Sequence, residues 1–389
     1  MRSTEIDRRR FLAMVAAYGG AGLAASLNAW GAGASDVPSA MTDAARDAPL
    51  YLAARKNAGK FEATVIDEAG QDQLVIPLPD RGHSFAIDAP RGRAVAFGRQ
   101  PGFFALAFDV KGKHATHTLL PAAYRHFFGH GVFSPDGKLM VATENDYEAG
   151  HGVLGVYDAS RGGNYRRVGE FLTHGVGPHE VVLMADGRTL CVANGGILTH
   201  PDYGKLQLNA DTMQPSLAYI DIVSGELLEQ VFLPAQWYRL SIRHLVVDGQ
   251  GAVWFGCQHT GPAHERPPLV GRHRRGREVD MFTGSDEDLR SMKNYVGSLA
   301  CNEAGTVVAT SSPVGGQVLF WATDSGRCLA AATIFDGCGI APASGSGFLV
   351  TSGRGTVEQR SVEGSQLALR VAAPDLAWDN HLRQVSACL

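Results

Sequence analysis

A recurring sequence unit constrains the fold more than any other feature of this chain. Each copy begins with a histidine or a small residue and continues as a short apolar run, an Asp- or Gly-containing turn and a second apolar run. Turns that contain Asp-Gly tolerate positive φ angles and connect antiparallel strands. Each copy therefore predicts a β-hairpin. The seven copies begin at His83, His130, His179, His244, Ser298, Cys338 and His381.

Further strand-like runs follow the hairpins, as at 154–158, 217–221 and 318–321, so that each repeat holds about four strands. The copies begin 40 to 65 residues apart, and four-stranded units at this period are typical of propeller blades. We expect an all-β fold, a seven-bladed β-propeller of the YVTN/WD40-like type. Because the fifth and sixth copies are weakly marked, six or eight blades remain alternatives.

The last copy is short and points to the way in which the ring closes. Residues 381–385 supply one strand, whereas the runs 50–55, 61–67 and 73–77 precede the first histidine. We expect the C-terminal strand to complete the N-terminal blade, since closure removes free sheet edges. The propeller would then span 50–389. The two widest intervals predict insertions at 195–214 and 261–293, and long loops of this kind often bind ligands.

The N-terminus has the pattern of an export signal. A twin-arginine run at 8–12 precedes a weakly apolar stretch rich in Ala and Gly, and a small-x-small site ends at Ala34. We expect a Tat signal peptide over 1–34, cleaved near Ala34, a linker over 35–49 and a periplasmic location. A mitochondrial-type presequence or a chance match are the alternatives. No later apolar run has membrane length, so we expect no membrane span after signal removal.

Composition excludes several classes of function. The net charge is −4, the isoelectric point is about 6.4, and no basic face is interleaved with aromatics, so a nucleic-acid partner is not expected. The one basic run, 272–277, predicts a solvated loop. The six cysteines lack the CxxC, CxxCH and zinc spacings, and their fifteen possible disulfide pairings stay open. Hydrolase, P-loop and dinucleotide motifs are absent from the sequence.

Five of the seven repeat starts are histidines, and this recurrence gives the candidate site. The first strand of each propeller blade lines the channel, so equivalent positions fall on one circle. Imidazole is a common ligand for copper, zinc, iron and nickel. We predict a site for a metal ion or for an anionic or polar ligand, with copper or iron as candidate cofactors. The alternatives are a structural role, in which the rings bond to backbone between blades, and chance recurrence in a chain rich in histidine. The predicted ligands are His83, His130, His179, His244 and His381.

Residues beside this ring add to the hypothesis. Cys338 either supplies a thiolate, which would favour copper, or fills space. Glu180 and Asp379 are candidates to accept the second nitrogen of a ligating histidine. Glu144 and Asp146 are either metal ligands or a general base, or belong to a solvated acidic loop. No catalytic residue follows from the sequence.

A resemblance rests on the leader and on the motifs at 81–85, 129–137, 177–180 and 243–245. Over about residues 50–385 the chain resembles an uncharacterised family of Tat-exported bacterial propellers. The resemblance implies periplasmic handling of a metal, iron in particular, with imelysin-like or di-haem oxidoreductase-like proteins as partners. The chain is also similar in architecture to the propeller domain of nitrous-oxide reductase, whose inward histidines bind copper. That enzyme's cysteine-rich copper domain is missing here, so nitrous-oxide reduction is not expected.

Three functions therefore remain open. The first is a periplasmic metal-binding or redox accessory protein that uses the histidine ring. The second is a non-catalytic scaffold that docks periplasmic partners. The third is a lactonase-like hydrolase that would hold a divalent ion through Glu144, Asn145 and Asp146. A propeller fold hosts all three, so the fold alone does not decide whether the chain is an enzyme.

Overall fold

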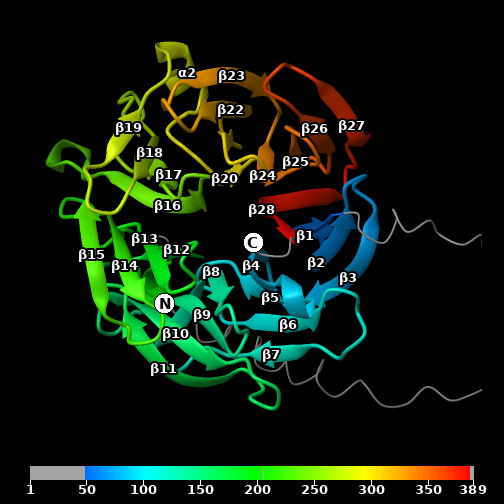
Figure 1. Ribbon diagram of the computed structural model, residues 1–389, viewed down its shortest axis with the longest axis vertical. Helices are drawn as coiled ribbons and strands as arrows, with labels where there is room; N and C mark the ends of the chain where they lie inside the picture. The colour runs from blue at the N-terminus through cyan, green and yellow to red at the C-terminus, as the bar shows by residue number, and fades with distance from the viewer. Residues whose placement is uncertain (1–48, 205, 386–389) are drawn as a thin grey trace, which may run out of the picture. The chain divides into compact units, whose positions relative to one another are not determined.

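The computed structural model describes residues 49–204 and 206–385. Seven four-stranded antiparallel sheets stand in a ring around a central channel (Figure 1). The chain is thus a seven-bladed β-propeller, as predicted, and the alternatives of six and eight blades are wrong. The predicted signal peptide, and the predicted linker up to residue 48, lie outside the described residues.

The blade that joins the two ends of the chain, here blade 1, confirms the expected closure. The C-terminal strand lies innermost in this sheet and pairs with the first strand of the chain, with Leu52 opposite Arg383. No sheet edge is therefore left open at the seam of the ring. The strands of blade 1, from the channel outwards, are β28 (Leu376–Val385), β1 (Leu50–Asn57), β2 (Lys60–Asp67) and β3 (Asp72–Leu78).

The other six blades follow in chain order, each beginning at the channel (Figure 1). Blade 2 consists of β4 (Gly82–Asp88), β5 (Arg93–Gly98), β6 (Ala105–Asp109) and β7 (His117–Leu119). Blade 3 consists of β8 (Arg125–Phe133), β9 (Leu139–Asp146), β10 (His151–Asp158) and β11 (Arg166–Leu172). Blade 4 consists of β12 (Pro178–Leu183), β13 (Thr189–Asn194), β14 (Ser216–Asp221) and β15 (Leu227–Phe232). Blade 5 consists of β16 (Leu240–Val247), β17 (Val253–His259), β18 (Val270–His273) and β19 (Asp280–Phe282). Blade 6 consists of β20 (Ser298–Cys301), β21 (Val307–Ser312), β22 (Gln317–Ala322) and β23 (Cys328–Thr333). Blade 7 consists of β24 (Gly337–Pro342), β25 (Phe348–Ser352), β26 (Val357–Arg360) and β27 (Gln366–Arg370).

Helical segments are short and lie between strands: η2 (Ala89–Arg91), η3 (Pro201–Tyr203), η4 (Ala235–Trp237) and α2 (Asp286–Ser291). Within the described ranges, no helix has both the length and the apolar character needed to cross a bilayer.

The turn between β8 and β9 shows how the repeated Asp-Gly sequence makes a hairpin. The Asp136 carboxylate accepts hydrogen bonds from the Ser134 hydroxyl and the Lys138 backbone N–H. Gly137 has a φ of +64°, and a Cβ there would lie 2.4 Å from an Arg91 guanidinium nitrogen. The positive φ favours glycine at this position, whereas the arginine, a flexible side chain, could move away from a Cβ.

The core lies between the blades, because each sheet packs against its neighbours on both faces. All six residues of β13, a second strand, are buried, whereas the outermost strand β11 is mostly exposed. A strand buried on both faces is a continuous apolar run rather than an alternating one, and the middle strands have this sequence pattern. One cluster of buried apolar side chains joins blades 4, 5 and 6 and includes the fully buried Trp254 and Trp321.

Two segments differ from the sequence expectation. The predicted insertion at 261–293 contains β18 and β19, the outer half of blade 5, and α2. The predicted solvated basic loop begins inside β18, where the His273 ring is buried and lies 2.7 Å from the Tyr219 hydroxyl. The segment between β13 and β14 is a long connection, as expected, with η3 as its only described helical turn.

Candidate metal centre

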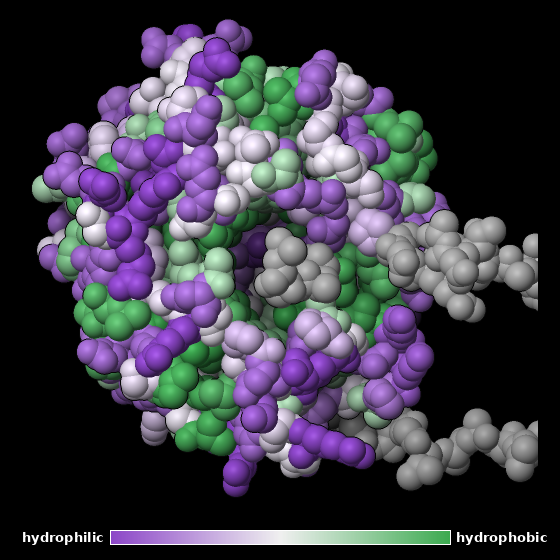
Figure 2. All heavy atoms as spheres, viewed as in Figure 1, coloured by the Kyte–Doolittle hydropathy of each residue, from purple (hydrophilic) through white to green (hydrophobic). Residues whose placement is uncertain are grey.

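All five predicted histidines lie on the innermost strands and meet in the channel. They stand on β4, β8, β12, β16 and β28, from five different blades. Each is almost fully buried, with 1 to 7% of its surface exposed. Figure 2 shows a hollow at the centre of the ring of blades, with hydrophilic residues in its depth. The repeat position therefore places five imidazoles around one axis.

Bulges in the innermost strands accompany this convergence. Pairing with the next strand is interrupted at the repeat position in blades 1, 2, 3, 4 and 7. In blade 5 the interruption falls one residue earlier, at Arg243, and His244 itself pairs with Gly256. Blade 6 keeps a regular register, and there the equivalent residue is Ser298. A bulge changes the direction of a side chain without ending the strand. The bulges thus turn the histidines towards the channel, a feature that the sequence analysis missed.

The rings are close enough to share one ligand. Eight of the ten pairs of rings have centroid separations between 4.5 Å, for His83 and His381, and 6.1 Å, for His130 and His244. Two overlapping groups, which share His130, have their candidate ligand nitrogens within 4.8 Å of one another. The two groups are His83, His130 and His179, and His130, His244 and His381.

Burial keeps all five rings uncharged at neutral pH. Removal from water lowers the pKa of His83 to about 4 and holds the pKa of His130, His179 and His381 well below the usual 6.5. Burial also lowers the pKa of His244, although the Glu180 carboxylate opposes this shift. A neutral imidazole keeps a lone pair, which a metal ion requires.

Two buried carboxylates lie close to Nδ1 of three of these rings. Glu180 lies 3.6 Å from Nδ1 of His130 and 3.4 Å from Nδ1 of His244, while Asp379 lies 3.4 Å from Nδ1 of His83. Burial opposes the charge on Glu180, but Arg383 and the two histidines hold its pKa below its usual value. A carboxylate on the far nitrogen of an imidazole is the usual support of a metal-binding histidine. The positions proposed for Glu180 and Asp379 from the sequence fit this role.

Several ring nitrogens of the cluster have no partner among the described residues. They include Nε2 of His130, Nδ1 of His179, Nε2 of His244 and both nitrogens of His381. Each buried polar atom left without a hydrogen bond costs about 1–3 kcal/mol. Within the same residues no hydrogen bond joins any of the five rings to the backbone, which argues against the structural alternative. The cluster thus presents ring nitrogens without a partner, and a bound metal ion would use some of them as ligands.

Cys338 does not join the cluster. Its thiol donates to the backbone carbonyl of Asp336 at 3.0 Å, and burial raises its pKa well above the usual value. The two groups of candidate ligands contain histidines only. The thiolate that would favour copper is therefore not in place. The described cysteines, all free, are Cys191, Cys257, Cys301, Cys328 and Cys338.

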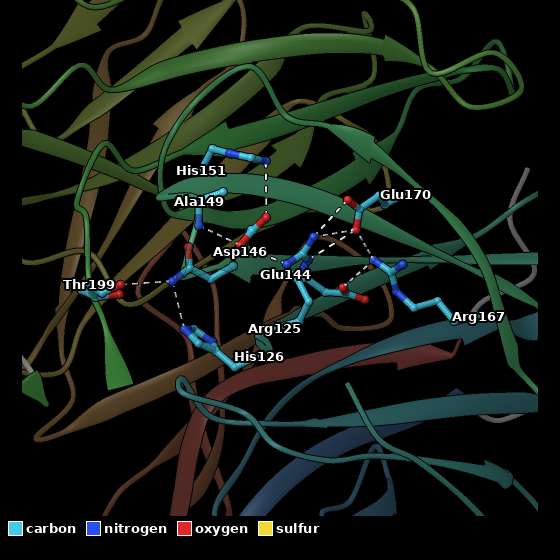
Figure 3. Close-up of polar contacts among 10 residues, drawn as sticks. Arg125, His126, Glu144, Asp146, Ala149, His151, Arg167, Glu170 and Thr199 are labelled. Carbon is cyan, nitrogen blue, oxygen red and sulfur yellow. Dashed lines mark hydrogen bonds and ion pairs between the residues drawn. The ribbon is translucent and has the colours of Figure 1, made fainter. Parts of the chain in front are cut away.

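The acidic run after the second repeat forms a separate network in blade 3 (Figure 3). Glu144 is fully buried at the end of β9, where it accepts hydrogen bonds from the Tyr157 hydroxyl and from Arg167. Asp146 pairs with Arg125 at 2.9 Å and lies 3.7 Å from His151. The interpretation of this run as a solvated loop is wrong, because these residues belong to a buried strand.

The same network also engages Asn145, whose amide lies 3.1 Å from Nε2 of His126 and donates to the Thr199 carbonyl at 3.2 Å. Glu144, Asn145 and Asp146 follow one another on a strand and use their polar atoms in different contacts. They do not converge on one point, so they do not form the ion site that a lactonase-like hydrolase would need.

The fold and the site together define an all-β propeller with a buried histidine cluster on its axis. The chain belongs to the DUF1513 family, described as a protein of unknown function, whose model matches residues 76–385. No curated protein sequence shows significant similarity to the chain.

Solved structures support the fold. The chain is similar to one from Kuenenia stuttgartiensis hydrazine synthase, with 14% identity, a TM-score of 0.57 and coverage of 80% of this chain and 92% of that chain. It is also similar to a chain of a mitotic checkpoint complex, with 10% identity, a TM-score of 0.54 and coverage of 75% and 80% respectively. At these identities the likeness concerns the fold alone.

Proposed function

We propose that this protein is an exported propeller that binds a transition-metal ion in its central histidine cluster. One observation carries the proposal: five uncharged, buried imidazoles converge, and several of their nitrogens lack any partner in the described chain. A purely structural cluster would leave these polar atoms unsatisfied at a cost in stability.

The donor set indicates which ion fits. His130 belongs to both groups of candidate ligands, so it would bind the ion together with two or more of the remaining four histidines. Imidazole donors suit iron, copper, zinc and nickel, whereas thiolate donors would select the softer ions. Because Cys338 bonds elsewhere, its thiolate gives the site no added preference for copper, and iron and copper both remain candidates.

Export and iron handling form the wider part of the proposal. The twin-arginine leader at 8–12 supports passage through the Tat system to the periplasm. The resemblance to Tat-exported propellers found beside imelysin-like and di-haem proteins supports a role in iron acquisition with such partners. Replacement of Arg8 and Arg9 by lysine is expected to keep the protein in the cytoplasm, which fractionation of the producing cells would reveal.

Metal titration tests the binding step. Metal-free protein is titrated calorimetrically with Fe²⁺ under anaerobic conditions and, separately, with Cu²⁺ and Zn²⁺. We expect binding of at least one ion near one equivalent, and loss of that binding in the double variant His130→Ala, His179→Ala. The matched control is His114→Ala, His117→Ala, which removes two exposed histidines of blade 2. Equal binding by both double variants would contradict the proposal.

A further inference from the structure

Positive charge exceeds negative charge around the histidine cluster. Arg383 pairs with Glu180, and Arg81 and Arg99 both approach Asp379, at 2.5 and 3.3 Å. The two carboxylates nearest the rings are thus already engaged by three guanidinium groups. A fourth arginine, Arg243, precedes His244 on β16, and its positive charge is among the causes that lower the pKa of that histidine.

Arg243 has no counter-charge. Within the described residues it makes no hydrogen bond or ion pair, and its Nε atom is buried without a partner. Burial lowers its pKa to about 10, and Arg99 acts in the same direction while Tyr295 opposes it. The group therefore stays charged at neutral pH. Arg243 as a whole is only partly buried, and no carboxylate among the described residues pairs with it, so an anion from solution can supply the missing partner.

The arginines lie within electrostatic reach of the rings. Arg243 contributes to the lowered pKa of His179 and of His244, after the larger effect of burial, and Arg99 does the same for His83. A divalent ion held by neutral imidazoles would add two positive charges to this already cationic region. An anion would offset both the ion and the unpaired guanidinium.

We propose that the histidine cluster binds its metal ion together with a small oxyanion or carboxylate, held by the guanidinium of Arg243 with Arg99 as the second cation. This inference rests on the proposed metal site. The planar guanidinium presents paired N–H donors that match two oxygens of such an anion. The anion is small because the surrounding rings and strands are packed, with every ring of the cluster nearly inaccessible to solvent.

Calorimetric titration with sodium phosphate and with sodium oxalate tests the inference, in metal-free protein and in protein loaded with Co²⁺. We expect the wild type to bind at least one of these anions, and Arg243→Gln to weaken that binding by about tenfold or more. Arg239→Gln is the matched control: it lies on the loop just before β16, and its guanidinium is one-third exposed and pairs with Asp211 at 3.5 Å. The control is expected to bind as the wild type does.

The outcomes separate the anion site from the metal site. Co²⁺ uptake by Arg243→Gln at wild-type stoichiometry, with anion affinity lost, supports the inference. Co²⁺ uptake without anion binding by the wild type, or equal anion affinity in Arg243→Gln, overturns it and leaves the metal site standing. If the wild type binds the anion through Arg243 but takes up no Co²⁺, the result contradicts the metal site and not the anion site. If Arg243→Gln does not fold, as judged by circular dichroism, Arg243→Lys replaces it, and anion affinity unchanged by loss of the planar guanidinium overturns the inference.

Discussion

Glu180 reaches across a blade boundary to place its carboxylate 3.4 Å from Nδ1 of His244, on the innermost strand of the next blade. The same carboxylate lies 3.6 Å from Nδ1 of His130, on the blade before it. Because both contacts use Nδ1, the Nε2 atoms of these two rings stay free. Glu180 thus lies between rings of the two neighbouring blades, and its charge favours a proton on the Nδ1 atom of each ring, which would leave the lone pair on Nε2.

Glu180→Gln tests this role of the carboxylate. Glutamine keeps the shape and can still accept the hydrogen bond that the Leu245 backbone N–H donates, but it removes the charge facing the two rings. We expect metal affinity to fall by about 10- to 100-fold, as for other carboxylates that support histidine ligands. Glu170→Gln, on the outer strand β11, is the control. Calorimetric affinities that do not differ between the two variants would show that Glu180 has no part in metal binding.

The buried rings predict a characteristic loss of stability in mild acid. Their folded-state pKa values lie below 6.5, so between pH 6.5 and about 4 the unfolded chain binds protons that the folded protein excludes. Stability of the metal-free protein should therefore fall as the pH is lowered through this range, by at most about 1.4 kcal/mol per pH unit for each histidine. Glu180 and Asp379, whose pKa values are lowered, add their own loss only below the usual carboxylate range.

Urea denaturation between pH 7.5 and 5 measures this dependence. His381→Asn removes one titrating ring and should give a shallower slope than the wild type, whereas His114→Asn, with a side chain 79% exposed, should leave the slope unchanged. A wild-type stability that does not vary over this range would mean that the rings are not held neutral by burial.

Closure of the ring can be tested by a pair of leucine substitutions. Leu382 on β28 is 1% exposed and packs with Tyr51 and Trp378 at the seam between the chain ends. Leu382→Ala should cost about 2–5 kcal/mol of unfolding free energy, because it leaves a cavity in that seam. Leu367→Ala, at a site 55% exposed, should change the free energy by less than about 0.5 kcal/mol. Similar urea midpoints for both variants would refute the closure.

Much of the fold was predictable because the repeated hairpins carry both their turn chemistry and their apolar runs in local sequence. The five histidines were identifiable for the same reason, since each occupies the same place in its repeat. The bulges that aim them were not, because a bulge depends on how one strand pairs with its neighbour. No pattern within a single strand encodes that register.

Long-range contacts explain the remaining differences. β18 has only four residues, two of them Arg272 and His273, and its burial depends on partners such as Tyr219 in another blade. Glu144 looked like part of a solvated acidic run, but Arg167 from β11 and Tyr157 from β10 give its carboxylate buried partners. Arg243 belongs to the motif at 243–245, but its lack of a counter-charge among the described residues is visible only in three dimensions.

Elemental analysis of the mature, exported protein tests the central claim most directly, with the His130→Ala, His179→Ala variant prepared in parallel. The account predicts close to one equivalent of a transition metal, iron or copper, in the wild type and none in the variant, with both proteins folded by circular dichroism. Wild-type protein that contains no metal and takes up none when it is added, or a variant that keeps the wild-type metal content, would contradict the account.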